Sequence, residues 1–216
     1  SSVAGFLGDP NPGYTNNNRR DLDRSVSASH IPHNLTVNYQ WELPFGKGKR
    51  WLGTAPRAVN WVAGGWQMNG IISLSDGYPL SIFDSSSAQN TRIGANEQLR
   101  VNLIPGGNTN PVLGGPDNYF DLRQFVPSVC QGTTICRPNT ADYEPGYFGT
   151  LGRNTLILPG RATVDFTLSK NYAVTEAMKV QFRLEAYNIF NHTNFGIPVV
   201  NSFDASNRAN AETGRI

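Results

Sequence analysis

Four stretches of this 216-residue chain alternate apolar and polar residues, and this alternation constrains the fold more than any other feature. In residues 34–45, one parity is apolar and the other is polar. The apolar set is Leu35, Val37, Tyr39, Trp41, Leu43 and Phe45, and the polar set is Asn34, Thr36, Asn38, Gln40, Glu42 and Pro44. Successive strand side chains point to opposite faces, so the pattern predicts an extended strand with one apolar and one polar face.

The same period of two predicts strands at 33–45, 61–83, 161–174 and 178–190. The second is long beside the typical strand of about 5–6 residues, and Asp76-Gly77 within it indicates a bulge or a kink. A helix is the alternative for 174–190, because Glu, Ala, Met and Leu favour helices, but the alternation favours a strand.

These strands predict two antiparallel hairpins joined by a long loop. The hairpins are 33–83 and 161–190, the long loop is 84–160, and further loops are expected at 1–32 and 191–216. Within the long loop we expect short strands near 99–104 and 119–126. Short turns at one end and long loops at the other are typical of transmembrane barrels. The expected fold class is therefore all-β, with long antiparallel strands forming part of a transmembrane β-barrel whose long loop is extracellular.

Aromatic residues fall near both ends of the predicted strands. Trp41, Trp51, Trp61, Trp66 and Tyr172 map near the short turns, and Tyr78, Phe83, Tyr187, Phe190 and Phe195 map near the opposite end. Two aromatic belts are what the two membrane interfaces select. A soluble antiparallel sheet with aromatic residues in its core is the alternative. Four strands are too few to close a membrane barrel, which takes at least about eight, so the chain is expected to be part of a larger or multi-chain barrel.

Charge and composition point away from nucleic acid. The net charge is +2, charged residues make up 16% of the chain, and there is no long basic run. No stretch holds the roughly 20 apolar residues of a spanning helix. Residues 1–20 lack an apolar core, so we expect no signal peptide in them. Cys130 and Cys136 bracket a polar segment and predict a local disulfide in an oxidising compartment, with two free thiols in a cytosolic loop as the alternative.

No catalytic or metal motif stands out, so we expect neither an enzyme nor a cofactor. The three histidines, His30, His33 and His192, lie in no nucleophile or metal motif. Two sets of residues are candidates for binding instead. Gln40, Glu42, Asp165, Arg183 and Glu185 share the polar parity and are predicted to face a lumen, or else to pair as opposite charges on adjacent strands. Tyr119, Phe120, Tyr143, Tyr147 and Phe148 are predicted to contact a ligand, or else to pack the long loop onto the barrel rim.

Several motifs resemble the C-terminal barrel of TonB-dependent receptors, and among these the Oar-like group with a carboxypeptidase-regulatory-like N-terminal domain. The resemblance covers roughly residues 20–216. Its motifs are Trp41-Glu-Leu-Pro-Phe-Gly-Lys-Gly48, Gly64-Gly-Trp-Gln-Met-Asn-Gly70, Gly77-Tyr-Pro79, Gly149-Thr-Leu-Gly-Arg-Asn-Thr-Leu156, Pro159-Gly160, Val164-Asp-Phe-Thr-Leu-Ser-Lys170, Val180-Gln-Phe-Arg-Leu-Glu-Ala-Tyr-Asn-Ile-Phe-Asn-His192 and Asn194-Phe-Gly196.

The resemblance implies a bacterial outer-membrane barrel of 22 strands with a plug inside, and uptake of a ligand driven by the inner-membrane TonB complex. The implied partners are outer-membrane lipid, the rest of the barrel, the plug and TonB. The chain has no plug or TonB box, so it is expected to supply four strands near the end of the barrel. Two other functions are open: a secreted structural protein that assembles into a fibre or multi-chain barrel through open strand edges, and a secreted sugar-binding sandwich.

Overall fold

The computed structural model describes residues 20–85, 99–130, 149–175, 178–204 and 206–216. It divides into two compact units that do not follow the order of the chain. One, here called the sheet unit, comprises His33–Ser75 and Arg161–Asn194. The other, here called the loop unit, comprises Ser1–Pro32, Asp76–Gly160 and Phe195–Ile216.

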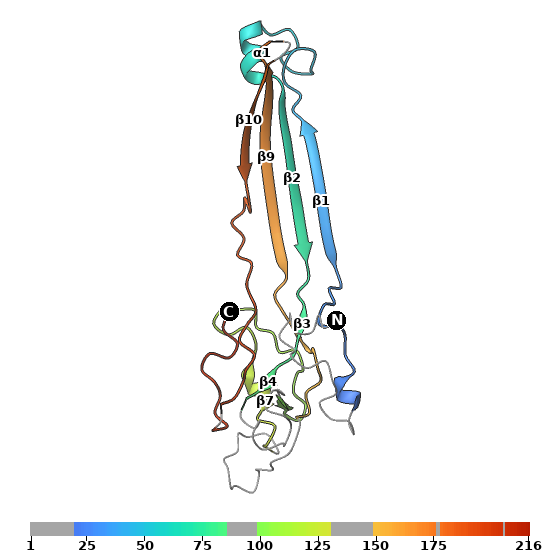
Figure 1. The fold of residues 1–216 in the computed structure, drawn as a ribbon, viewed down its shortest axis with the longest axis vertical. Coiled ribbons are helices and arrows are strands. Elements are labelled where there is room, and N and C mark those ends of the chain that lie inside the picture. Colours follow the sequence, from blue (N-terminus) through green and yellow to red (C-terminus); the bar gives the residue numbers. More distant parts are fainter. Residues whose placement is uncertain (1–19, 86–98, 131–148, 176–177, 205) are drawn as a thin grey trace. The chain divides into compact units, whose positions relative to one another are not determined.

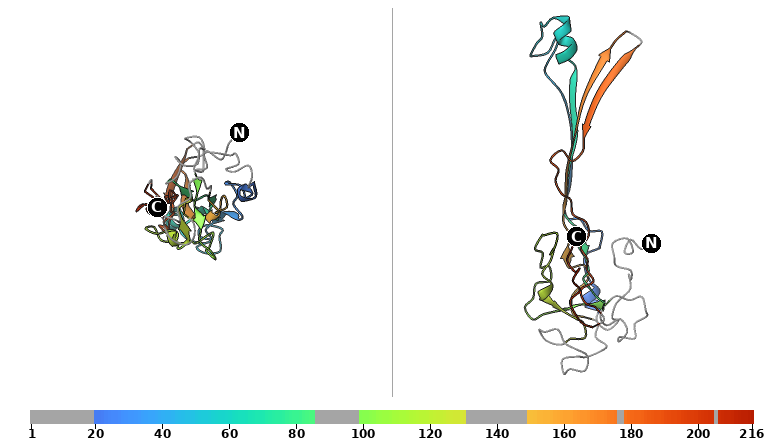
Figure 2. Two further views of the ribbon diagram at one scale, coloured as in Figure 1. Left: turned by 90° about the horizontal axis from the view of Figure 1, so that it is seen from below. Right: turned by 90° about the vertical axis from the view of Figure 1, so that its left-hand side faces the viewer.

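The sheet unit is built on four long antiparallel strands (Figure 1). They are β1 (Asn34–Glu42), β2 (Trp66–Ser75), β9 (Arg161–Ala173) and β10 (Lys179–Ala186), in the order β1-β2-β9-β10. The expected all-β fold with long antiparallel strands is confirmed. Among the described residues, neither β1 nor β10 has a second neighbouring strand, so the sheet has two open edges. Its twist is visible in the right-hand view of Figure 2.

The strand register places the apolar parities of all four strands on one face. One row across the sheet pairs Trp41 with Met68, Met68 with Leu168, and Leu168 with Leu184. The next row pairs Gln40 with Asn69, Asn69 with Thr167, and Thr167 with Glu185. Adjacent rows point to opposite sides of a sheet. The sheet therefore has one apolar and one polar face along its whole width.

The second predicted strand differs from the structure at both ends. Residues Arg57–Ala63 form the short helix α1, and β2 begins only at Trp66, after Gly64-Gly65. At the other end β2 stops at Ser75. Gly77 follows, and its backbone lies so close to Leu158 that a Cβ there would be 1.7 Å from the Leu158 carbonyl oxygen. The predicted kink at Asp76-Gly77 is thus the end of the strand. Within the described ranges, no helix is long and apolar enough to cross a membrane.

The loop unit gathers three separate parts of the chain around one small core. Its pairs are β3 (Pro79–Leu80) with β8 (Leu156–Ile157), β4 (Phe83–Asp84) with β5 (Leu99–Arg100), and β6 (Asn102–Leu103) with β7 (Phe125–Val126). The 3-10 turns are Arg20–Asp23 and Leu122–Gln124. The core side chains are Ile82, Val101, Tyr119, Phe120, Phe125, Leu151, Leu156 and Phe203. The expected short strands near 99–104 and 119–126 correspond to β5, β6 and β7.

All four chain connections between the units leave the sheet from the same end. Asn34, Ser75 and Arg161 are paired in one row at that end, and the Asn194 Nδ2 donates to the Ala162 carbonyl oxygen at 3.0 Å beside it. The opposite end carries the connector with α1 between β1 and β2, and the turn between β9 and β10. Here it is called the connector end.

Candidate functional site

The apolar face of the sheet is the most unusual surface of the described residues. Trp41, Phe182 and Leu184 are exposed by 53%, 51% and 52% although they are large and apolar. They come from three positions on the two outer strands, and Leu35, Val37 and Val180 are exposed beside them. A soluble sheet would bury such a face under a second layer. Along the outer strands, the described residues provide no such layer.

The length of the strands fits the thickness of a membrane. The nine residues of β1 and the ten of β2 rise by roughly 3.3 Å each, so these strands span about 30 Å. A transmembrane strand needs about 9–11 residues when it is tilted. Aromatic residues mark both ends within the sheet unit: Trp61, Trp66 and Tyr172 lie at the connector end, and the exposed Tyr187 and Phe190 follow β10 at the other. Both features suit a strand that crosses a bilayer.

The opposite face carries the polar residues singled out from the sequence. Gln40, Glu42, Asp165, Arg183 and Glu185 all occupy register positions on it. The face has a hollow of about 270 Å³ on β2, β9 and β10, toward the end that carries α1, lined by Gln67, Asn69, Thr167, Ser169, Gln181 and Arg183. Among these six side chains only Arg183 is charged. The hollow offers hydrogen-bonding groups and no catalytic arrangement.

The charged residues of the polar face make local contacts along strands and turns. Arg183 and Glu185 form an ion pair along β10, and Glu185 also accepts a hydrogen bond from the Tyr187 hydroxyl at 2.9 Å. The Asp165 carboxylate accepts from the Asn188 backbone N–H at 2.9 Å, which fixes the chain as it leaves β10. Glu42 pairs with Lys49 at 2.8 Å. Neither of these two ion pairs joins adjacent strands as the alternative for these residues expected, and a lumen-facing role stays a prediction.

The loop aromatics expected to bind a ligand are only partly within the described residues. Tyr119 and Phe120 are buried in the core of the loop unit, and the Tyr119 hydroxyl donates to the Ile157 carbonyl oxygen at 2.8 Å. Burial raises the pKa of Tyr119. Both side chains are in place for packing, and contact with a ligand stays a prediction. Tyr143, Tyr147 and Phe148 lie outside the described residues.

Of the two cysteines, only Cys130 lies among the described residues. Cys130 is buried in the loop unit beside Val126 and Val129, and its carbonyl oxygen accepts a hydrogen bond from the Asn102 Nδ2 at 2.9 Å. Cys136 lies outside the described residues, so the Cys130–Cys136 disulfide stays a prediction.

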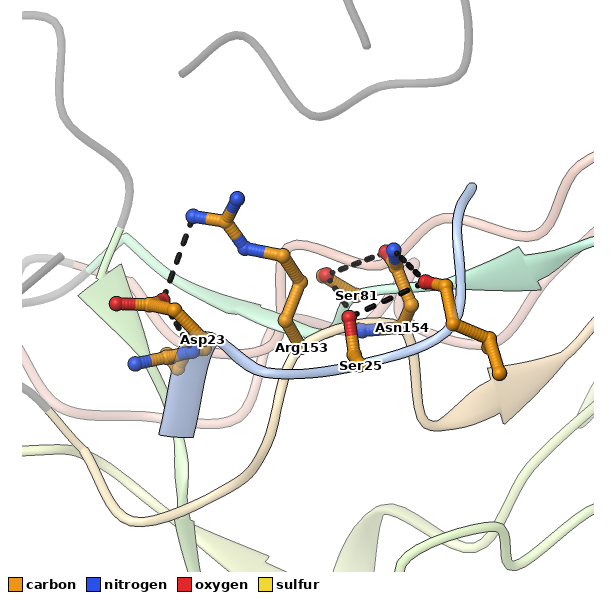
Figure 3. A network of polar contacts seen from close by, with 7 residues as sticks. Asp23, Ser25, Ser81, Arg153 and Asn154 are labelled. Atoms are coloured by element: carbon orange, nitrogen blue, oxygen red, sulfur yellow. Dashed lines mark hydrogen bonds and ion pairs between the residues drawn. The ribbon is translucent and has the colours of Figure 1, made fainter. Parts of the chain in front are cut away.

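A buried polar network holds the N-terminal part of the loop unit to its core (Figure 3). The Asp23 carboxylate lies 2.9 Å from Arg100 Nη1 and 3.4 Å from Arg153 Nη2. Beside it, Asn154 accepts from the Ser81 hydroxyl at 3.1 Å and donates to the Val26 carbonyl oxygen at 2.9 Å. The side chains of Asp23 and Arg100 are each only 2% exposed, so this network is internal and structural. Among the described residues, no group of three or more His, Cys, Asp or Glu side chains could hold a metal ion.

One residue of the apolar face was not anticipated. Lys170 occupies an apolar-parity position of β9, directly across from Trp66 on β2, and is buried. Its Nζ donates to the Val62 carbonyl oxygen of α1 at 2.6 Å and lies 5.1 Å and 4.7 Å from the ring centroids of Trp66 and Tyr172. The sequence does contain a signal for this contact, because Lys170 interrupts the apolar parity of its strand. A charged side chain on an apolar face needs a polar partner close by.

Known protein families include one whose model matches this chain. The chain matches the outer membrane beta barrel domain over residues 1–216. Neither the curated proteins nor the solved structures that were compared gave a match.

Proposed function

The chain belongs to the family of outer membrane beta barrel domains, and we propose that it forms part of the wall of a TonB-dependent receptor that takes up a ligand across the outer membrane. Membership of the family puts the chain in a lipid environment in the outer membrane. The observation that supports the barrel wall is the apolar face, which is continuous across β1, β2, β9 and β10 and half exposed at its outer strands. Lipid covers such a face without a second protein layer.

The two open edges fit a wall that continues into further strands. Unpaired backbone groups within a bilayer are costly, so β1 and β10 need neighbours on their outer sides. In the proposal these neighbours are other strands of the same barrel. The polar face then looks into the lumen, where its hollow faces the plug or the passing ligand. The loop unit is extracellular, and the connector end is periplasmic.

The receptor assignment draws on the sequence motifs around Gly64–Gly70 and Val180–His192 as well as on the family. It assigns the chain no catalysis. The test is binding between the complete protein, purified from outer membranes in detergent, and the purified periplasmic domain of TonB, measured by calorimetry. Binding is expected. A complete protein that migrates as a heat-modifiable barrel but shows no heat of binding would leave the barrel standing and remove the TonB dependence.

The open edges also favour a second candidate function, a structural protein that joins copies of itself edge to edge. Under this alternative the purified 216-residue chain polymerises. Negative-stain microscopy separates the two: long polymers support self-assembly, and monodisperse particles in detergent support the barrel wall.

A further inference from the structure

The connector between β1 and β2 concentrates positive charge at one end of the sheet. Residues 43–65, here called the basic connector, contain Lys47, Lys49, Arg50 and Arg57 and no acidic residue. The chain has two other lysines, Lys170 and Lys179, and both lie at this same end, on β9 and at the start of β10. All four lysines of the chain are therefore at the connector end, whereas the arginines are spread along the chain.

Most of this charge has no ion-pair partner among the described residues. Lys49 is paired with Glu42. Lys47, Arg50 and Arg57 are exposed and make no ion pair within the described parts of the chain. Three solvent-facing cations on one short segment form a surface that attracts anions.

The same connector exposes large apolar side chains. Trp61 and Val62 of α1 are exposed by 63% and 66%, and Trp51 by 50%. Leu52 is also exposed, and its backbone has a φ of +61°, a conformation that leucine rarely adopts. Apolar residues and cations side by side on a short segment are typical of elements that lie in a membrane interface.

Specific contacts hold the basic connector in one shape. The Gly46 N–H donates to the Trp51 carbonyl oxygen at 2.9 Å, and the rings of Phe45 and Trp51 lie 5.0 Å apart. The Asn60 side-chain oxygen accepts from the Lys47 backbone N–H at 2.5 Å, and Gly46 packs so closely on Gly64 that a Cβ on Gly46 would lie 2.7 Å from the Gly64 Cα. The exposed side chains are thus presented by an ordered element.

Lys170 fixes this element to the apolar side of the sheet. Its Nζ and the Trp66 Nε1 both donate to the Val62 carbonyl oxygen, at 2.6 Å and 3.0 Å. Trp66 and Lys170 are on the apolar face, and the Trp61 ring packs on Tyr172 of the same face at 5.1 Å. The exposed Trp61 and Val62 therefore continue the apolar face toward its end, where a bilayer changes from hydrocarbon to headgroups.

From these contacts we infer that the basic connector is a binding site for the headgroups of anionic phospholipids at the surface of the membrane. Trp61, Val62 and Trp51 insert at the interface, and Lys47, Arg50 and Arg57 contact the phosphates. The inference rests on the proposed membrane wall, because it needs the apolar face to be in lipid. It goes beyond that wall by assigning a lipid class and the residues that select it.

The test uses tryptophan quenching in vesicles. The complete protein is reconstituted into an equal mixture of phosphatidylcholine and phosphatidylglycerol, with brominated acyl chains on one of the two lipids. The fluorescence of Trp61 is obtained as the difference between the wild type and Trp61→Phe. The fluorescence of Trp41, which lies on the sheet itself, is obtained in the same way from Trp41→Phe. Brominated phosphatidylglycerol is expected to quench Trp61 more strongly than brominated phosphatidylcholine does. For Trp41, the quenching by brominated phosphatidylglycerol is expected to be no stronger than that by brominated phosphatidylcholine.

The double variant Lys47→Ala/Arg50→Ala is expected to weaken the preference for phosphatidylglycerol at Trp61 by roughly twenty-five-fold, at about fivefold for each basic residue. High salt is expected to weaken it too. The matched control Arg24→Ala/Arg208→Ala neutralises two exposed arginines of the loop unit and is expected to keep the preference. Equal quenching of Trp61 by both lipids, or a preference that survives the double variant, overturns the inference. Absence of Trp41 quenching overturns the membrane wall itself.

Discussion

At the scale of single residues, the buried ion pair between Asp23 and Arg100 carries the clearest prediction. Both side chains are almost fully buried, and the carboxylate also lies near Arg153. Asp23→Asn removes the negative charge that lies 2.9 Å from the buried Arg100 Nη1. We expect the loop unit to lose about 3–5 kcal/mol of unfolding free energy. Hydrogen exchange followed by mass spectrometry measures this loss on peptides of the loop unit.

The matched control for that variant is Asp121→Asn. Asp121 also faces an arginine, at 2.8 Å, but the Arg123 side chain is 87% exposed, so water screens the pair. The hydrogen bonds from Arg123 lower the pKa of Asp121 without making the pair an important contribution to stability. A loss of protection in Asp121→Asn as large as in Asp23→Asn would show that burial does not decide the strength of these pairs.

Tyr119 makes the stability of the loop unit depend on alkaline pH. Burial raises its pKa in the folded state, so the unfolded chain releases the phenol proton first as the pH increases. Its contribution is complete below the ordinary tyrosine value of about 10 and is lost as the pH rises through the higher folded value. Urea unfolding followed by near-ultraviolet circular dichroism should show this decline in the wild type and a smaller decline in Tyr119→Phe. The exposed Tyr78→Phe should keep the wild-type decline.

At the scale of elements, the two faces of β1 give opposite expectations for the same substitution. Val37 and Thr36 are neighbours near the middle of the strand, on the apolar and the polar face. Val37→Arg places a charge against lipid and is expected to cost about 2–4 kcal/mol, whereas Thr36→Arg faces the lumen and costs much less. The measurement is the urea dependence of folding of the complete protein into vesicles, with each substitution in turn. Equal losses for the two variants would contradict a lipid-facing Val37.

The long strands could be predicted from the sequence because their signal is local. In β1, every second residue from Leu35 to Trp41 is apolar, so the sequence alone indicates which side chains share a face. The strand register then places the apolar residues of neighbouring strands on the same face. The helix α1 could not be predicted in the same way. Its seven residues are too few for a helical period to stand out, and Val62 and Gly64 continue the parity of Trp66, so the strand was expected to begin early.

The core of the loop unit could not be predicted, because its members are far apart in the sequence and follow no period. Ile82, Val101 and Phe203 pack together from three separate segments. The aromatics Tyr119 and Phe120 stand out by composition, but only their burial distinguishes packing from an exposed ligand site. Lys170 shows the same limit: its parity is readable from the sequence, whereas its partner on α1 depends on the tertiary fold.

At the scale of the whole molecule, the distribution of lysine offers a test of orientation. The chain joins the sheet to the loop unit from one end only, and all four lysines lie at the other. In the proposed orientation the loop unit is extracellular and the lysines are periplasmic. The exposed Lys47 and Lys179 are then out of reach of any reagent that cannot cross the outer membrane.

We therefore expect a membrane-impermeant amine reagent to leave Lys47 and Lys179 unlabelled in intact cells that express the complete protein, and to label both once the outer membrane is permeabilised. Mass spectrometry of the peptides reads out each site. Arg123→Lys supplies the matched positive control, because it puts an amine on a highly exposed position of the loop unit and should be labelled in intact cells. Labelling of Lys47 from outside, with the amine at position 123 protected, would reverse the orientation and move the basic connector to the outer leaflet.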